Sequence, residues 1–239
     1  MRGSTIIRRR KLFLQRVVLS LSLAFLPGAV CAQSHFEGNV FWGAKGGAGI
    51  SRVFFNPSVK QKFPVGAVAG LMFRYIEENH FGLIAELNFE QRGWKENFET
   101  TRYSYRRTLN YIQIPVLAHI YFGSPRAHFF LNAGPEIGFM VGESTSSNFD
   151  TADIANLPDF PIKDRQVAQL TLPCDIKVDY GISVGLGAEV FLNGRNSLCF
   201  EARFYYGLGN IMKTGRTEPF SAANSMGLMA TFGYWFRAK

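Results

Sequence analysis

The sequence predicts an all-β protein: an eight-stranded antiparallel up-and-down transmembrane β-barrel with short periplasmic turns and longer extracellular loops. Three observations lead to this fold class. Eight segments alternate apolar with small or polar residues, their connections alternate between short and long, and no run of 18 apolar residues follows the first 32 residues. The chain also has 23 Phe, 24 Gly and only 18% charged residues, which excludes disordered, collagen-like and disulfide-scaffold proteins.

Residues 1–32 are expected to be a cleaved signal peptide, which leaves 33–239 as the barrel domain. Residues 8–16 include five Lys and Arg, residues 17–26 are apolar apart from two Ser, and small residues precede the expected cleavage site. An apolar run of this length is too short to span a bilayer, which takes about 20 residues. A lipoprotein cleaved at Cys31 is the alternative, but a Gly stands three positions earlier, where such signals carry Leu or a similar residue.

The net charge of +8 belongs to this leader and does not indicate a nucleic-acid partner. Residues 1–32 hold six of the 26 Lys and Arg and no acidic residue, so the mature chain has 20 basic against 18 acidic residues. No nucleic acid is therefore expected among the partners.

The first four strands are each predicted by a period of two. In residues 42–51, Trp, Ala and Ile occupy one face of the expected strand and Gly, Lys and Ser the other. In residues 65–74, Val, Ala, Leu and Phe occupy one face and Gly and Arg the other. Residues 83–92 oppose Leu, Ala and Phe to Glu, Asn and Arg. Residues 111–120 oppose Ile, Val and Ala to Tyr, Gln and His.

The last four strands follow the same rule. Residues 129–139 set Phe, Leu, Ala and Ile against Asn, Gly and Glu. Residues 180–191 are the clearest case, since the even positions from 182 to 190 are all apolar and the odd positions are Gly, Ser or Glu. Residues 198–207 and 227–236 oppose aromatic and aliphatic residues to Glu, Arg, Thr and Gly. An even strand count suits a closed bacterial barrel.

The connections favour an outer-membrane barrel over a soluble sandwich or lipocalin-type barrel. The short ones are expected at 76–80, 123–127 and 192–196, and the long ones around 53–63, 95–107, 143–177 and 210–224. A soluble sheet would carry more Lys, Asp and Thr on its polar face, where this chain has many Gly. Aromatic residues cluster near both strand ends, as membrane girdles do. Those expected in the outer girdle are Phe89, Trp94, Phe139, Phe204 and Tyr206.

The polar faces predict a salt-bridged lumen. The charged residues expected to point inward are Lys45, Arg74, Glu86, Glu90, Arg92, Glu136, Glu189, Glu201 and Arg203. These are four cations and five anions, and buried charges are tolerated when they are paired. A selective pore would show an excess of one sign, and Tyr111, Tyr205 and Trp235 are expected to fill much of an eight-stranded interior.

No catalytic, cofactor-binding or metal site is predicted. Enzymes on this architecture need a polarised nucleophile or a supported His, and none of the four His lies at the expected extracellular rim. The Cys and His residues lack metal-ligand spacing. Cys174 and Cys199 are expected to remain unpaired, since Cys199 alternates with residues assigned to the interior.

The longest loop, 143–177, is the candidate partner site. It is rich in Ser, Thr, Asn and Asp, with apolar residues spread through it. These could dock an envelope protein or pack over the barrel mouth, and 166–172 could form a short β extension.

Three stretches resemble the PorT-like outer-membrane β-barrel family: 73–83 (FRYIEENHFGL) with its continuation to 94, 109–115 (LNYIQIP) and 132–138 (NAGPEIG). The resemblance covers about 43–236. It implies a Gram-negative outer-membrane barrel without a catalytic site, and some family members serve the type IX secretion apparatus.

The sequence therefore predicts a non-enzymatic structural or accessory component of a cell-envelope complex. It would contact outer-membrane lipids along the barrel and a protein partner through its loops. A narrow porin-like channel and a lipid-modifying enzyme are the alternatives.

Overall fold

The structure is a computed structural model that describes residues 38–98, 102–161 and 166–238. The expected signal peptide, 1–32, lies outside the described residues. In the described part of the chain, no helix is both long and apolar enough to cross a membrane.

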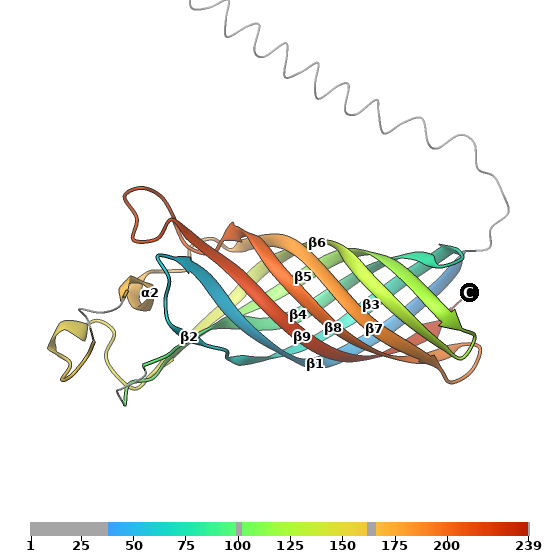
Figure 1. Cartoon of the computed structure of the whole chain (residues 1–239), viewed down its shortest axis with the longest axis horizontal. Coiled ribbons are helices and arrows are strands. Elements are labelled where there is room, and N and C mark those ends of the chain that lie inside the picture. The colour runs from blue at the N-terminus through green and yellow to red at the C-terminus, as the bar shows by residue number, and fades with distance from the viewer. Residues whose placement is uncertain (1–37, 99–101, 162–165, 239) are drawn as a thin grey trace, which may run out of the picture. The chain divides into compact units, whose positions relative to one another are not determined.

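Eight long strands form a closed antiparallel ring, in which each strand pairs with its sequence neighbours (Figure 1). They are β1 (Asn39–Asn56), β3 (Val65–Glu78), β4 (Phe81–Glu96), β5 (Tyr105–Ser124), β6 (Ala127–Ser147), β7 (Val178–Phe191), β8 (Asn196–Asn210) and β9 (Ala222–Arg237). Pairing of β1 with β9 and of β4 with β5 completes the circle. A two-residue strand, β2 (Gln61–Lys62), extends the sheet alongside β4. Closure gives each of the eight long strands two neighbours, so the backbone groups of the wall are satisfied without water.

The two ends of the ring differ in the length of their connections. The turns after β3, β5 and β7 are short and lie at the end where β1 begins and β9 ends (Figure 1). The described residues of the loops 57–64, 97–104, 148–177 and 211–221 lie at the opposite end. We call these the turn end and the loop end.

Alternation decides which side chains face outward. On β7 the even positions from Ile182 to Val190 are exposed apart from a half-buried Ala188, while the odd positions are mostly buried. The other strands follow the same rule, which leaves a belt of exposed Leu, Ile, Val and aromatic side chains around the ring. The predicted fold class is confirmed.

Three expectations about individual segments are wrong. Residues 166–172 form no β extension; they contain a one-turn helix, α2 (Ala168–Thr171). Loop 143–177 begins later than predicted, because β6 continues to Ser147 opposite Tyr105. Trp94 is not in the outer girdle. It shares the even register of Arg92, points inward and is 0% exposed.

Candidate functional site

All nine charged residues expected in the lumen are buried inside the ring, and the side chain of each lies within ion-pair distance of an opposite charge. They form three groups along the barrel. Each group links strands that are far apart in the sequence.

The middle group is built around Glu86 on β4. Its carboxylate accepts hydrogen bonds from Lys45 Nζ at 2.7 Å and from Arg203 Nη1 and Nη2 at 2.7 and 2.8 Å. Asn88 Nδ2 donates to the same carboxylate at 2.9 Å, and Arg203 also pairs with Glu201 at 2.7 Å. One carboxylate therefore ties β1 and β8 to β4 across the lumen.

Near the turn end, Arg74 pairs with Glu189 through two parallel hydrogen bonds of 2.5 and 2.9 Å. This bidentate geometry is the strong form of an Arg–carboxylate contact. The guanidinium carbon lies 4.3 Å from the ring centroid of Phe41 and 4.5 Å from that of Trp235. Ser197 donates a hydrogen bond to Glu189 as well.

Toward the loop end, Arg92 contacts three carboxylates. The N–O distances are 2.9 Å to Glu90, 2.6 Å to Glu136 and 3.5 Å to Asp179, and the ring of Tyr205 lies 3.7 Å from the guanidinium carbon. Asp179 was not among the predicted lumen residues, because the expected strand began at 180. It has the same odd parity as the inward positions of β7, so extending the expected strand by one residue includes it.

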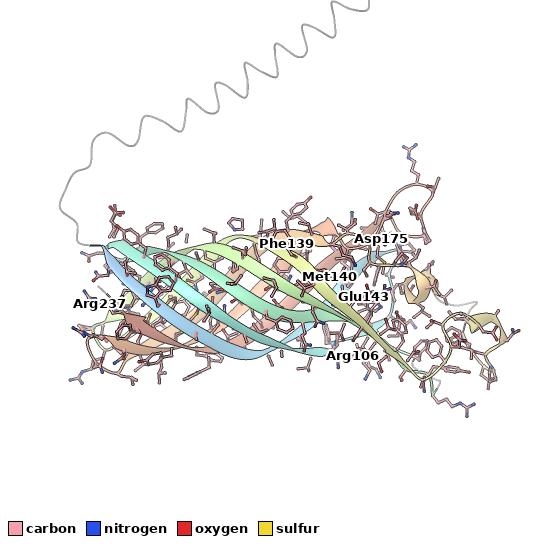
Figure 2. The ribbon with its side chains drawn as sticks, turned by 180° about the vertical axis from the view of Figure 1, so that it is seen from behind. Arg106, Phe139, Met140, Glu143, Asp175 and Arg237 are labelled. Atoms are coloured by element: carbon pink, nitrogen blue, oxygen red, sulfur yellow. The ribbon has the colours of Figure 1, made fainter. Side chains whose placement is uncertain are left out.

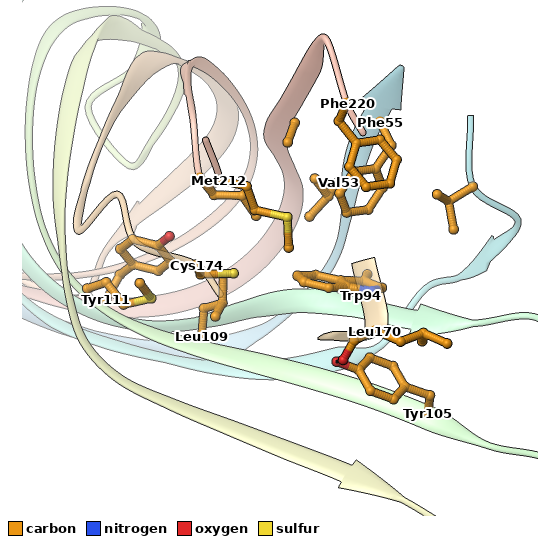
Figure 3. Close-up of a cluster of buried hydrophobic side chains, with 14 of the residues drawn as sticks. Val53, Phe55, Trp94, Tyr105, Leu109, Tyr111, Leu170, Cys174, Met212 and Phe220 are labelled. Atoms are coloured by element: carbon orange, nitrogen blue, oxygen red, sulfur yellow. The ribbon is translucent and has the colours of Figure 1, made fainter. Parts of the chain in front are cut away.

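Between the ionic groups and the loops, an apolar cluster fills the loop end of the barrel (Figure 3). The wall contributes Trp94, Leu109, Tyr111 and Met140, and the loops contribute residues that pack against them. These loop residues include Phe160, Leu170, Cys174, Met212 and Phe220. Of the two roles predicted for the apolar residues of loop 143–177, packing over the mouth is therefore the one that Phe160 and Leu170 fulfil.

We call the loop residues of this cluster the cap. Polar contacts hold the cap against the wall of the barrel. Gln169, fully buried in α2, donates from Nε2 to Glu96 Oε1 at 3.1 Å, and the Tyr105 hydroxyl donates to the Leu170 carbonyl at 3.2 Å. Arg107 on β5 binds both Glu143 and the carbonyl of Leu172. Figure 2 shows Glu143 at the loop end of the strands.

Within the same apolar cluster, the loops 97–104 and 148–177 share an aromatic core. Phe98, Tyr103, Phe149 and Phe160 meet mostly edge to face, with ring centroids 5.2 to 6.3 Å apart. The Tyr103 hydroxyl donates to the Pro158 carbonyl at 2.6 Å. We call residues 148–161 the loop tip. Packing of this kind holds a loop in one conformation.

The histidines do not form a catalytic arrangement in the described residues. His119 is buried and hydrogen-bonds through Nδ1 to Asn132 at 2.7 Å, while His80 and His128 stack on Tyr121. His35 lies outside the described residues. No group of three or more His, Cys, Asp or Glu that could hold a metal ion occurs among the residues with described positions.

Cys174 offers a chemical test of the cap. Both Cys174 and Cys199 are free and buried, and burial raises the pKa of the Cys174 thiol from 9.0 to about 12. In a Cys199→Ser background, we expect a maleimide at pH 7.5 to label the folded protein at least tenfold more slowly than the unfolded chain, since the thiolate is the reactive form. Equal labelling rates would show that the cap is open.

The pH dependence of the cap follows from the same shift. Below pH 9 the thiol is protonated whether the cap is closed or open, so its ionisation does not change the equilibrium between the closed and the open cap. Between pH 9 and 12 only the exposed thiol ionises, and closure is progressively disfavoured. Between pH 9 and 12, the labelling rate of the folded protein should therefore rise by a larger factor than the thiolate fraction of the unfolded chain does.

A closed antiparallel ring with an apolar outer belt, a charge-paired interior and turns shorter than its loops defines an outer-membrane β-barrel. The chain belongs to the family of the outer membrane protein beta-barrel domain, whose family model matches residues 31–213. It is accordingly a protein of the outer membrane. In such barrels the turns face the periplasm, so the loop end is the extracellular end.

Comparison with solved structures gives small barrels of this type. Neisserial surface protein A is 13% identical over 83% of this chain and 96% of that chain, with a TM-score of 0.43. OprG from Pseudomonas aeruginosa is 14% identical over 84% and 97%, with a TM-score of 0.45. Outer membrane protein W of E. coli is 16% identical over 85% and 99%, with a TM-score of 0.41. No curated protein matches this chain.

Proposed function

We propose that this barrel is a non-enzymatic structural or accessory component of a cell-envelope complex, and that it binds a protein partner through the loop tip. The observation that carries the proposal is the aromatic core that the tip shares with Phe98 and Tyr103 of the neighbouring loop. It keeps residues 148–161 folded, and it leaves the polar residues Asp150, Asp153, Asn156 and Asp159 exposed. A preorganised surface of this kind loses little conformational entropy on binding.

The filled lumen favours this role over a narrow channel. Tyr111, Tyr205 and Trp235 are almost completely buried inside the ring, and paired charges occupy the space between them. The cap then closes the extracellular end. A conducting pathway would require both the ion pairs and the cap to open.

A lipid-modifying enzyme is the second alternative and has less support. His119, buried in the lumen, hydrogen-bonds to the amide of Asn132 and stacks on the ring of Tyr121, and it lies far along β5 from the extracellular end. A nucleophile would need a neighbouring base within hydrogen-bond reach.

The finer assignment is to the PorT-like family, some of whose members serve secretion. It is supported by the motifs at 73–83, 109–115 and 132–138. We include a secretion complex among the partners to be sought.

Two exposed acidic residues of the tip provide the test. We expect a tagged protein, cross-linked in cells and purified in mild detergent, to bring down a stoichiometric envelope protein. Asp150→Asn with Asp159→Asn should reduce its recovery at least fivefold, because both carboxylates are solvent-facing and their loss leaves the aromatic core intact.

The matched control changes two acidic residues at the same end of the barrel, Asp175→Asn with Glu218→Gln, and should retain the partner. Recovery of a lone barrel from the unmodified protein would contradict the proposal. Single-channel conductance and activity toward lipid A would then be measured to decide between the two alternatives.

A further inference from the structure

The outer wall of the barrel carries three cations in one row across neighbouring strands. Lys62 of β2 stands opposite Lys95 of β4, and Lys95 stands opposite Arg106 of β5. Lys62 and Lys95 are exposed and Arg106 is half-buried. Neighbouring strands lie about 4.8 Å apart, so the three side chains emerge close together.

This arrangement is unfavourable for the protein alone. Like charges directly opposite each other destabilise a sheet. Among the described residues, no carboxylate lies within ion-pair distance of Lys62, Lys95 or Arg106. In the part of the chain that the structure describes, the oxygens to which Arg106 donates are uncharged, those of Val65 at 2.7 Å and Thr108 at 3.3 Å. The neighbouring Glu96 is buried and accepts from Gln169.

The row borders the lipid-facing belt at its extracellular edge. Outward apolar residues on β4 end at Phe89, and a hydrogen-bonded polar pair, Gln91 with Asn110 at 3.1 Å, follows before the row. Beside it, Phe63 and Val65 remain 56% and 60% exposed. Figure 2 places Arg106 at the opposite end of the barrel from Arg237.

We propose that Lys62, Lys95 and Arg106 form a binding site for the phosphate groups of an anionic lipid headgroup in the outer leaflet. A phosphate would neutralise the three like charges and accept charge-assisted hydrogen bonds, two of them from the fork of Arg106. The acyl chains of the same lipid would cover Phe63 and Val65. This adjacency of unpaired cations and exposed apolar side chains selects a lipid over a soluble polyanion.

The test compares lipids that differ only in phosphate. Purified folded barrel in non-ionic detergent is titrated with diphosphoryl lipid A and with its phosphate-free form, and bound lipid is counted by native mass spectrometry. We expect the diphosphoryl lipid to bind at least tenfold more tightly than the phosphate-free form. The variant Lys62→Gln/Lys95→Gln/Arg106→Gln should bind both equally weakly.

A charge-matched variant, Arg102→Gln/Lys213→Gln/Arg216→Gln, removes three exposed cations elsewhere at the same end and should stay within twofold of the unmodified protein. Gel mobility before and after boiling verifies that all variants are folded. Equal affinity of the unmodified protein and the row variant would overturn the proposal. Inorganic pyrophosphate binding as tightly as the lipid would overturn the lipid assignment in favour of a soluble phosphate.

Discussion

Replacing Glu86 by Ala should lower the free energy of unfolding by about 3–5 kcal/mol, the usual cost of removing one partner from a buried ion pair. The Glu86 carboxylate is the acceptor for both Lys45 and Arg203, and all three side chains are no more than 2% exposed. Arg203 keeps Glu201, but Lys45 loses its ion-pair partner. The effect can be measured as the urea midpoint of the heat-modifiable form in detergent.

Two comparisons identify the origin of this loss. Glu77→Gln, at the periplasmic turn, also removes one carboxylate but should change stability by less than about 0.5 kcal/mol. In a Lys45→Met background, Glu86→Ala should cost at least about 1 kcal/mol less than alone, because the two residues are directly coupled. A loss as small as that of Glu77→Gln would show that water reaches Glu86 and that the lumen is hydrated.

Alternation predicts the barrel wall well because each residue has only two choices, lipid or lumen. That is why Lys45, Arg74 and Glu189, which are far apart in the sequence, could all be assigned to one interior. Their charges had to be paired there, since nothing else in a lumen of this width compensates them. The identity of each pair, such as Arg74 with Glu189, depends on the stagger between strands, and alternation does not determine this stagger.

The loops could not be predicted in the same way. Residues 166–172 form a helical turn because Leu170 packs into the barrel mouth and Gln169 reaches Glu96, contacts that no local pattern reveals. The row of cations formed by Lys62, Lys95 and Arg106 is not predicted from the sequence for a related reason. Lys62 belongs to a two-residue strand, which is too short for a period to be visible.

Two adjacent glycines on β1 should respond oppositely to the same substitution. A Cβ on Gly47 would lie 2.1 Å from the carbonyl oxygen of Ala230 and 2.8 Å from the Cα of Thr231, both backbone atoms of β9. Backbone atoms cannot rotate away, so β1 and β9 would have to separate at the seam that closes the ring. We expect Gly47→Ala to cost at least the 1–3 kcal/mol typical of overpacking, and Gly47→Val to reduce the yield of folded barrel at least fivefold.

Gly46→Ala is the matched control. The nearest atom to a Cβ at Gly46 is the carbonyl oxygen of Val68, 3.9 Å away, so the methyl group fits without displacing the wall. Its folded yield should equal or exceed that of the unmodified protein, because Ala restricts the unfolded chain more than Gly does. Refolding from urea into detergent micelles, scored by gel mobility without boiling, measures both variants side by side. If Gly47→Val folded as well as Gly46→Ala, the close approach of β1 and β9 would not limit closure of the ring, and the seam would tolerate a wider spacing.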